Sequence, residues 1–405
     1  MIIKNQKPEE ILFSELKLKH IILKNRLIRS ATYEGMADKD GYPSIKLADI
    51  YLKLAENDVG TIITGFCYVS KEGKAMHPRQ IGIDEDSKIE PWKEIVSKVK
   101  NKVPSVKLFM QIAHAGRQTT KEATKSKVVA PSNKKCSYFK EKPEILENNE
   151  ILSIIEDFRN SAVRAKKAGF DGIQIHSAHG YLIHQFLSPY LNNRKDIWGK
   201  DRFEFLRRII LSIKSSCGEN YPIILKISAE DDNPLGIKIS DTIAYLKEVE
   251  KLNIDAVEIS YGTMEFALNI IRGDIPLNCI FRINPFFKNK PQLTKKLWKL
   301  FVFPRYKRSL IPFTENYNLD YAKRIKEEIS LPIFLVGGLR NVDSMKKILT
   351  MDKIDAISMC RPFICEPDFA SKIRNHETKI SKCKNCNMCT IMVDSLNSLK
   401  CWKYS

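Results

Sequence analysis

A regular alternation of short aliphatic runs with longer amphipathic segments constrains the fold of this chain most strongly. Strands that alternate with helices predict βαβ units and a parallel sheet. Eight such units over about 330 residues favour a closed (β/α)8 TIM barrel, in the α/β class, over an open doubly wound sheet. No GxGxxG motif follows the first run, which also argues against a Rossmann fold. We expect strands at residues 26–31, 61–65, 107–112, 172–176, 223–228, 256–260, 333–337 and 355–359, and helices at 45–57, 91–102, 151–168, 201–217, 240–252, 318–329, 341–350 and 366–375.

Composition restricts the location and the partners. No apolar run reaches the roughly 18 residues that span a bilayer, and residues 1–10 lack an apolar core and a cleavage site, so we expect a cytoplasmic protein. The ten cysteines are then expected to be thiols or metal ligands rather than disulfides. The excess of 67 Lys and Arg over 48 Asp and Glu is mostly spread over helical segments, as an AT-rich genome would produce. We expect no nucleic-acid partner, because no recognised motif accompanies the charge.

Polar and glycine residues gather at the predicted C-terminal ends of the strands, where barrel enzymes carry their chemistry. They come from six of the eight units, so we expect them to share one face of the barrel. These residues are Thr32 and Tyr33 after the first strand, Gln111 and His114 at the third, His176, His179 and Tyr181 after the fourth, Lys226 on the fifth, Gly337 and Gly338 after the seventh, and Arg361 after the eighth.

The segment after the fourth strand suggests a site for a polar substrate group. His176 and His179 can each donate a hydrogen bond to one substrate oxygen, and Tyr181 can act as a general acid beside them. The alternatives are a metal-binding pair or two buried structural histidines. Neither a third histidine nor a convergent carboxylate accompanies the pair, which argues against a metal.

Lys226 lies within an apolar strand, IILKIS. A buried ammonium group needs an anionic partner. That partner is either a bound anion or electron-rich ring, or a nearby carboxylate such as Glu230 or Asp231.

Two glycines and an arginine follow the last two strands. Gly337 and Gly338 come after the seventh strand, and Arg361 comes after the eighth. The loops at these positions form the common phosphate site of TIM barrels, through backbone N–H groups and a cation. The combination therefore indicates an anion-binding site.

The motifs NRLIRSATYEG, QIAHAGRQT, HSAHGYLIHQFLSP, LVGGLR and SMCRPFICEPD resemble those of the Old Yellow Enzyme family. The resemblance extends over about residues 8–375. It implies FMN at the C-terminal mouth of the barrel and NAD(P)H as the reductant. The barrel that the periodicity predicts agrees with this.

The resemblance also implies roles for individual residues. Two positions depart from the family pattern: Tyr33 stands where many members carry Thr or Cys, and Cys360 stands where Gly or Ser is frequent. The implied roles are Ser30, Ala31 and Thr32 along the flavin ring, Gly65 where the ring approaches the second strand, Gln111 at its pyrimidine edge, Lys226 near N1 and O2, Gly337, Gly338, Cys360 and Arg361 at the phosphate, His176 and His179 at the substrate carbonyl, and Tyr181 as the proton donor.

The C-terminal segment holds four cysteines in the spacing C-x2-C-x2-C-x11-C. Four thiolates so spaced suit an iron–sulfur cluster or zinc, and unmetallated thiols are the remaining alternative. The pattern resembles the [4Fe–4S] site of the family branch that includes dienoyl-CoA reductases and trimethylamine dehydrogenase. The four residues are Cys383, Cys386, Cys389 and Cys401.

Two connections are longer than usual for a barrel, and we expect both to be lid-like: residues 115–150 and 261–316. Within the second, residues 275–314 interleave aromatic and basic side chains without an acidic one. This stretch could bind CoA-like phosphates, an acidic redox partner or a membrane surface, but we favour a lid that packs its apolar half over the barrel. We expect residues 1–375 to form the barrel and 376–405 the cysteine-rich tail.

A short stretch before the first strand, LKLKHIILKNR, predicts a hairpin that plugs the N-terminal end of the barrel.

These features together predict an FMN-dependent NAD(P)H oxidoreductase. The reaction that the resemblance implies is hydride transfer from flavin N5 to the β-carbon of an α,β-unsaturated carbonyl or thioester, with Tyr181 protonating the α-carbon. One alternative is oxidative dehydrogenation or demethylation of an amine. Another is an electron-transfer subunit that docks a redox partner through the basic loop. The sequence is also compatible with an oligomer.

Overall fold

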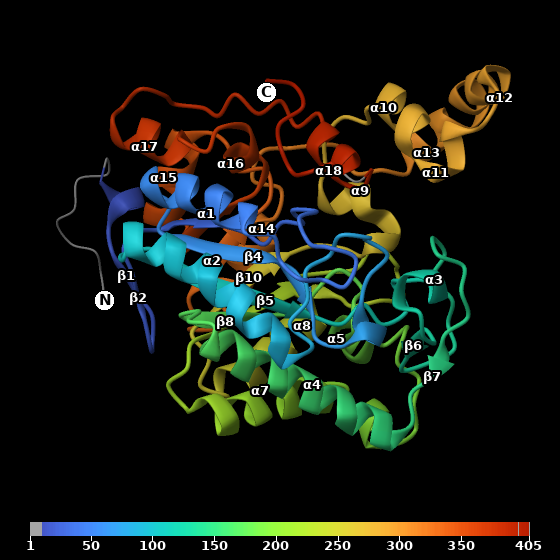
Figure 1. Cartoon of the computed structure of the whole chain (residues 1–405), viewed down its shortest axis with the longest axis horizontal. Helices are drawn as coiled ribbons and strands as arrows, with labels where there is room; N and C mark the ends of the chain where they lie inside the picture. Colours follow the sequence, from blue (N-terminus) through green and yellow to red (C-terminus); the bar gives the residue numbers. More distant parts are fainter. Residues whose placement is uncertain (1–9, 396, 405) are drawn as a thin grey trace.

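Eight parallel strands form a closed barrel in the computed structural model, which describes residues 10–395 and 397–404 (Figure 1). The strands pair in the order of the chain, and the last one returns to pair with the first. This confirms the predicted (β/α)8 barrel. The strands are β3 (Leu27–Arg29), β4 (Thr61–Tyr68), β5 (Lys107–Ala113), β8 (Gly172–Ser177), β9 (Ile223–Ser228), β10 (Ala256–Ser260), β11 (Ile333–Val336) and β12 (Ala356–Met359).

A helix follows each barrel strand, close to its predicted bounds. In α4, Ile151, Ile154, Ile155 and Phe158 are buried at the spacing of one helical face. The apolar face of each helix packs on the outside of the barrel. The strands beneath are therefore buried on both sides. The helices are α1 (Lys46–Glu56), α2 (Ile89–Lys102), α4 (Asn148–Lys167), α7 (Glu204–Cys217), α8 (Ile239–Glu250), α14 (Leu319–Lys326), α15 (Val342–Thr350) and α17 (Phe369–Arg374).

The N-terminal end of the barrel is plugged, as predicted, by an antiparallel hairpin of β1 (Leu16–Lys17) and β2 (Ile22–Leu23). Leu16, Leu18 and Leu23 form one buried apolar cluster with strand residues that include Phe109 and Phe334. The bottom of the barrel interior is therefore apolar, and polar chemistry is confined to the opposite end.

The two long connections carry secondary structure of their own. Figure 1 shows α10, α11, α12 and α13 grouped at the upper right, projecting from the barrel body. The expectation that the basic stretch packs its apolar half over the barrel is wrong for residues 292–308, where large apolar side chains such as Leu300 and Phe301 are exposed. That the two connections act as lids stays a prediction. The elements are α3 (Lys121–Thr124), β6 (Val129–Ala130) and β7 (Glu144–Ile145) in the first, and η4 (Met264–Phe266), α9 (Ala267–Ile270), α10 (Leu277–Ile283), α11 (Pro285–Lys288), α12 (Gln292–Leu297), the π-helical turn η5 (Trp298–Val302) and α13 (Phe303–Arg308) in the second.

The C-terminal tail runs back to the segment that follows the first barrel strand. The N–H of Leu399 donates to the carbonyl oxygen of Glu34 at 3.0 Å. The tail contains one short helix, α18 (Met388–Val393), which packs near α10. Within the described residues, no helix is both long and apolar enough to cross a membrane. Residues 1–9, where the sequence predicts no signal peptide, lie outside the described part.

The remaining short elements are η1 (Ile11–Phe13), η2 (Lys71–Gly73), η3 (Asp86–Lys88), α5 (Leu182–Leu187), α6 (Ile197–Lys200) and α16 (Arg361–Cys365).

Candidate active site

Lys226 lies inside the barrel and forms a buried ion pair. Its Nζ is 2.9 Å from Oε2 of Glu258 and donates to Oγ of Ser30 at 3.0 Å. Its protein partner is therefore Glu258, and not Glu230 or Asp231 as one alternative predicted. The reason is strand register, which places Lys226 on β9 directly beside Glu258 on β10. A lysine has three N–H donors, so one of them is left over from these two contacts.

A chain of hydrogen bonds continues from this pair across the barrel interior. Gln174 donates from Nε2 to Oε2 of Glu258 at 3.1 Å, and Gln111 donates to Oε1 of Gln174 at 2.6 Å. Burial alone would raise the pKa of Glu258, but Lys226 and a hydrogen bond from Ser358 hold that pKa below its usual value. The carboxylate is thus ionised and the interior network is connected.

Gln174, Glu258 and Ser358 were not predicted from the sequence. Each is a polar residue with apolar residues on both sides in a strand, in GIQIH, AVEIS and AISM. That pattern was a usable signal, because an isolated polar side chain in a buried strand needs a partner inside the fold.

His176, His179 and Tyr181 come together at the C-terminal end of β8, as predicted. The ring centroids of His176 and His179 are 5.1 Å apart, and those of His176 and Tyr181 are 4.8 Å apart. His179 adopts a left-handed backbone conformation, with φ of +61°, and its N–H donates to Oγ of Ser228 at 3.0 Å. Such a conformation is uncommon outside glycine and is kept where the surrounding structure fixes it.

The protonation states of these three side chains follow from their burial. Burial lowers the pKa of His176 and His179 well below the usual value, and the charge of Lys226 lowers both further. Burial also raises the pKa of Tyr181, with an added contribution from Asp394. At neutral pH the site therefore contains two neutral imidazoles and a protonated phenol.

Hydrogen bonds indicate which ring nitrogens of the histidines are available. Nδ1 of His176 accepts from the N–H of Ala178 at 3.4 Å, which places the proton of the neutral ring on Nε2. Nε2 of His179 is 2.8 Å from Oγ of Ser260, so Nδ1 is the nitrogen left for another contact. Each ring thus offers one nitrogen to a ligand.

An aromatic group lies beside the two histidines and Tyr181. The ring of Phe66 is 5.7 Å from that of Tyr181, and the ring of Tyr33 is 4.4 Å from that of His77. Nδ1 of His77 is 2.9 Å from Oδ1 of Asp394, which follows helix α18 in the tail. Phe66, His77 and Asp394 were not predicted from the sequence, and no local pattern marks a pair such as His77 and Asp394 that is 317 residues apart.

Gly65 makes room for a carboxylate in this structure. A Cβ atom there would lie 2.3 Å from Oε2 of Glu34, and the N–H of Gly65 donates to Oε1 of Glu34 at 3.1 Å. Glu34 is also paired with the guanidinium of Arg29 at 2.9 Å. The proposed approach of a flavin ring to Gly65 stays a prediction, as do the flavin contacts of Ala31 and Thr32, both half-buried after β3.

The residues expected at the phosphate follow β11 and β12. Gly337 and Gly338 have φ of +127° and +73°, which suits glycine. Sγ of Cys360 lies 3.9 Å from the carbonyl oxygen of Ala31.

Arg361 contacts residues of two other segments. Its Nη1 donates to the carbonyl oxygens of Ile271 and Arg272 and to Oδ1 of Asn387 in the tail. Its role at a phosphate stays a prediction.

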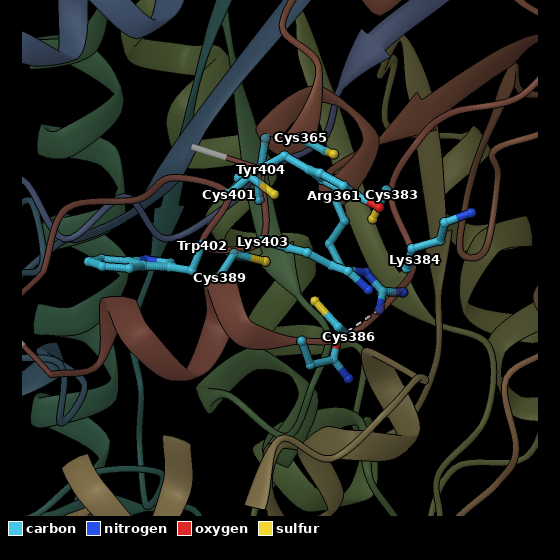
Figure 2. Close-up of a pocket in the computed structure, with 12 residues that line it drawn as sticks. Arg361, Cys365, Cys383, Lys384, Cys386, Cys389, Cys401, Trp402, Lys403 and Tyr404 are labelled. Carbon is cyan, nitrogen blue, oxygen red and sulfur yellow. Dashed lines mark hydrogen bonds between the residues drawn. The ribbon is translucent and has the colours of Figure 1, made fainter. Parts of the chain in front are cut away.

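All four predicted metal-ligating cysteines line one cavity, drawn in Figure 2 with Arg361 and Lys384. A fifth thiol, Cys365 at the end of α16, lines it too and was missed, because it precedes the motif. Burial raises the pKa of Cys389 to about 11, although Arg361 opposes the shift. Within the described residues, no three His, Cys, Asp or Glu side chains already form a metal site. The thiols of these cysteines suit a thiolate-bound metal. Their positions in the described structure do not yet form a metal-coordination geometry.

Comparison with known proteins agrees with the barrel fold. The family model described as NADH:flavin oxidoreductase / NADH oxidase matches residues 11–272. An NADH oxidase from Thermoanaerobacter brockii is 31% identical over 93% of this chain, which spans only 53% of that protein. An NADPH dehydrogenase from Geobacillus sp. (strain WCH70) is 34% identical, over 89% of this chain and 92% of its own length.

A solved structure shares the fold over almost the whole chain. It is an Old Yellow Enzyme homologue from Zymomonas mobilis, with a TM-score of 0.71 and 22% identity, covering 97% of this chain and 98% of that one. Because the family model matches more than half of the chain, the chain belongs to the NADH:flavin oxidoreductase / NADH oxidase family.

Proposed function

We propose that this chain reduces the C=C bond of α,β-unsaturated carbonyl compounds. The observation that carries the proposal is the group of two neutral histidines and one protonated tyrosine at the barrel mouth, His176, His179 and Tyr181. Neutral donors suit a neutral carbonyl oxygen, which becomes negatively charged only as the reaction proceeds.

The donor set at the mouth fits FMN. Gln111 has a buried amide for a pyrimidine edge, and Lys226 has a buried ammonium group with one N–H beyond its two protein partners. Gly338 would offer its N–H group to the phosphate, together with Gly337, Cys360 and Arg361. When bound, FMN supplies a two-electron carrier between NAD(P)H and the substrate.

His176 and His179 would hold the substrate by its carbonyl oxygen. Two N–H donors directed at one oxygen withdraw electrons from the conjugated double bond and stabilise the negative charge that develops on the oxygen. The ring of His176 is buried and His179 is half-buried, which limits the competition of water for that oxygen. The same contacts orient the substrate for reaction.

Tyr181 would deliver the proton that completes the reduction. Its raised pKa keeps the phenol protonated over the physiological range, so its O–H is available as a general acid. The ring of Phe66 packs edge-on against that of Tyr181 and fixes its position.

The test measures flavin reduction and substrate reduction separately in the variant Tyr181→Phe. We expect NADH to reduce the bound flavin at the wild-type rate, while reduction of cyclohexenone slows by about 10²- to 10⁴-fold. Tyr33→Phe is the matched control, because it removes another buried hydroxyl of the same mouth. Equal losses in both half-reactions of Tyr181→Phe would contradict the proton-donor role.

A second part of the proposal concerns the tail. Cys383, Cys386, Cys389 and Cys401 would hold a [4Fe–4S] cluster, which when bound supplies one-electron transfer. Support comes from the shared cavity that all four line. Protein purified without oxygen should contain iron and acid-labile sulfide and show a broad sulfur-to-iron absorption. Zinc without iron would contradict the cluster.

A cluster in the tail would also serve one alternative function, in which an amine is oxidised at the mouth and electrons leave through the tail. Adding an amine substrate without NAD(P)H should then bleach the flavin bands. Bleaching by NAD(P)H alone favours the reductive direction.

A further inference from the structure

Helices α12 and α13, with the π-helical turn η5 between them, form a projecting arm of residues 292–308, which we call the helical arm (Figure 1). Its outer surface exposes large apolar side chains. The exposed fractions are 67% for Leu293, 48% for Leu297, 65% for Leu300, 63% for Phe301 and 42% for Tyr306. Contiguous exposed side chains of this size usually mark an interaction site.

The inner side of the helical arm has its own aromatic packing. Trp298 lies 5.8 Å from Phe281, 4.9 Å from Phe287 and 5.9 Å from Phe303, measured between ring centroids. These contacts attach the arm to α10 and α11. The exposed leucines and Phe301 therefore take no part in this aromatic packing.

The exposed apolar residues follow a helical spacing. Leu293 and Leu297 stand at positions i and i+4 of α12, which lie on one face of the helix, and the exposed Leu300 and Phe301 follow in the π-helical turn η5. Such an apolar stripe on a helix outside the core needs a partner that accepts both its apolar and its polar faces.

The charge around the stripe has one sign. Residues 275–314 contain nine Lys and Arg and no Asp or Glu. Lys296, Lys299, Arg305, Lys307 and Arg308 are exposed, and in the part of the chain that the structure describes none of them pairs with a carboxylate. The stripe thus lies among unneutralised cations, and its partner must be anionic.

A membrane surface fits both properties better than a nucleic acid does. A nucleic acid would bind the cations and leave the leucines in water. A bilayer that contains anionic lipid receives the apolar side chains at the boundary of the acyl chains and the cations at the headgroups. We propose that the helical arm docks this enzyme on the surface of a bilayer that contains anionic phospholipid. The docking is peripheral and independent of the reaction at the mouth.

The experiment is co-sedimentation of the full-length holoenzyme with vesicles. Phosphatidylcholine vesicles with and without phosphatidylglycerol are compared at low and high salt. We expect binding only to the mixed vesicles, and weaker binding at high salt, because salt screens charge attraction. Absence of binding to the mixed vesicles at low salt would overturn the proposal.

Two variants test the two faces separately. Leu300→Ser with Phe301→Ser should weaken vesicle binding about tenfold or more, because the apolar contact is lost. Lys296→Glu with Lys299→Glu should weaken it similarly through charge. Leu211→Ser is the matched control, because Leu211 on α7 is 50% exposed but lies outside the arm. It should bind like the wild type.

Two further measurements keep the result interpretable. Flavin content and NADH-dependent flavin reduction should be unchanged in the arm variants, which shows that they fold. Binding to heparin should also persist in Leu300→Ser with Phe301→Ser. If that variant also binds mixed vesicles like the wild type, the arm is a general polyanion site and the membrane proposal is wrong.

Discussion

The barrel mouth and the cysteine tail differ in how their functional side chains are held. At the mouth, strand register and hydrogen bonds fix the groups, as in the chain from Gln111 through Gln174 to Glu258 and Lys226. In the tail, the thiol of Cys383 makes a long contact, 3.9 Å from Sγ to Oδ1 of Asn385. The protein alone positions the mouth, whereas a metal site commonly acquires its geometry from the metal.

This difference indicates that the barrel mouth is the more rigid of the two regions. A mutation at the mouth should disturb a network that is already complete in the fold, and its effect should extend to the stability of the barrel. A mutation of a tail cysteine should affect what the tail binds and little else. Four predictions test this contrast.

The largest effect is expected from Lys226→Met. The substitution leaves the carboxylate of Glu258 buried without its cation, and breaking such a pair costs about 3–5 kcal/mol of unfolding free energy. Urea denaturation of the apoprotein measures it. Lys226→Met combined with Glu258→Gln should recover much of the loss, because no buried charge then remains. A loss below about 1 kcal/mol in the single variant would mean that the mouth is less fixed than the structure indicates.

The second prediction concerns pH. Burial lowers the pKa of His114 to about 3, while an unfolded histidine titrates near 6.5. Between these values the unfolded chain binds a proton that the folded chain does not, so stability falls as the pH falls below about 6.5. His114→Gln should reduce this slope by up to about 1.4 kcal/mol per pH unit. His376→Gln, at an exposed position, is the control and should leave the slope unchanged.

A smaller effect is expected where the two regions touch. Asp394 of the tail adds to the rise in the pKa of Tyr181, although burial is the larger cause. Asp394→Asn should therefore lower that pKa by less than about one unit. The alkaline limb of the pH–rate profile for substrate reduction would move to lower pH. An unchanged limb would mean that solvent screens this charge from the tyrosine.

The smallest effect on the barrel is expected from Cys389→Ser. Metal binding in the tail should be lost, while the unfolding free energy of the metal-free protein should change by less than about 0.5 kcal/mol. Metal analysis and urea denaturation measure the two quantities. Cys217→Ser, a buried cysteine on α7 outside the motif, is the control and should keep the metal. A large destabilisation by Cys389→Ser would show that the tail supports the barrel.

The barrel was predictable because its strands are short apolar runs and its helices have regular apolar spacing. The positions of His176, His179 and Tyr181 at one strand end were predictable for the same reason, since a strand assignment fixes which end is the mouth. The anionic partner of Lys226 was not. Glu258 is remote in sequence, and only the pairing of β9 with β10 places the two side by side.

Contacts between loops were the least predictable part. The pairing of His77 with Asp394 and the direction of Arg361 toward Asn387 depend on how the tail folds back. Neither contact follows a periodic pattern, because the tail has little regular structure. The spacing of the four cysteines identified them as a group, but spacing does not reveal a fifth thiol, such as Cys365, that arrives from a helix outside the motif.

The pairing of β12 with β3 has a consequence for the synthesis of this chain. The first barrel strand is synthesised long before its second neighbour, which is made only at residues 356–359. Until then the growing sheet keeps two unpaired edges, which are templates for pairing with other chains. Contacts this distant in sequence also slow folding. A product that terminates before β12 would therefore be an open, aggregation-prone sheet, and nascent chains would need protection until β12 is made.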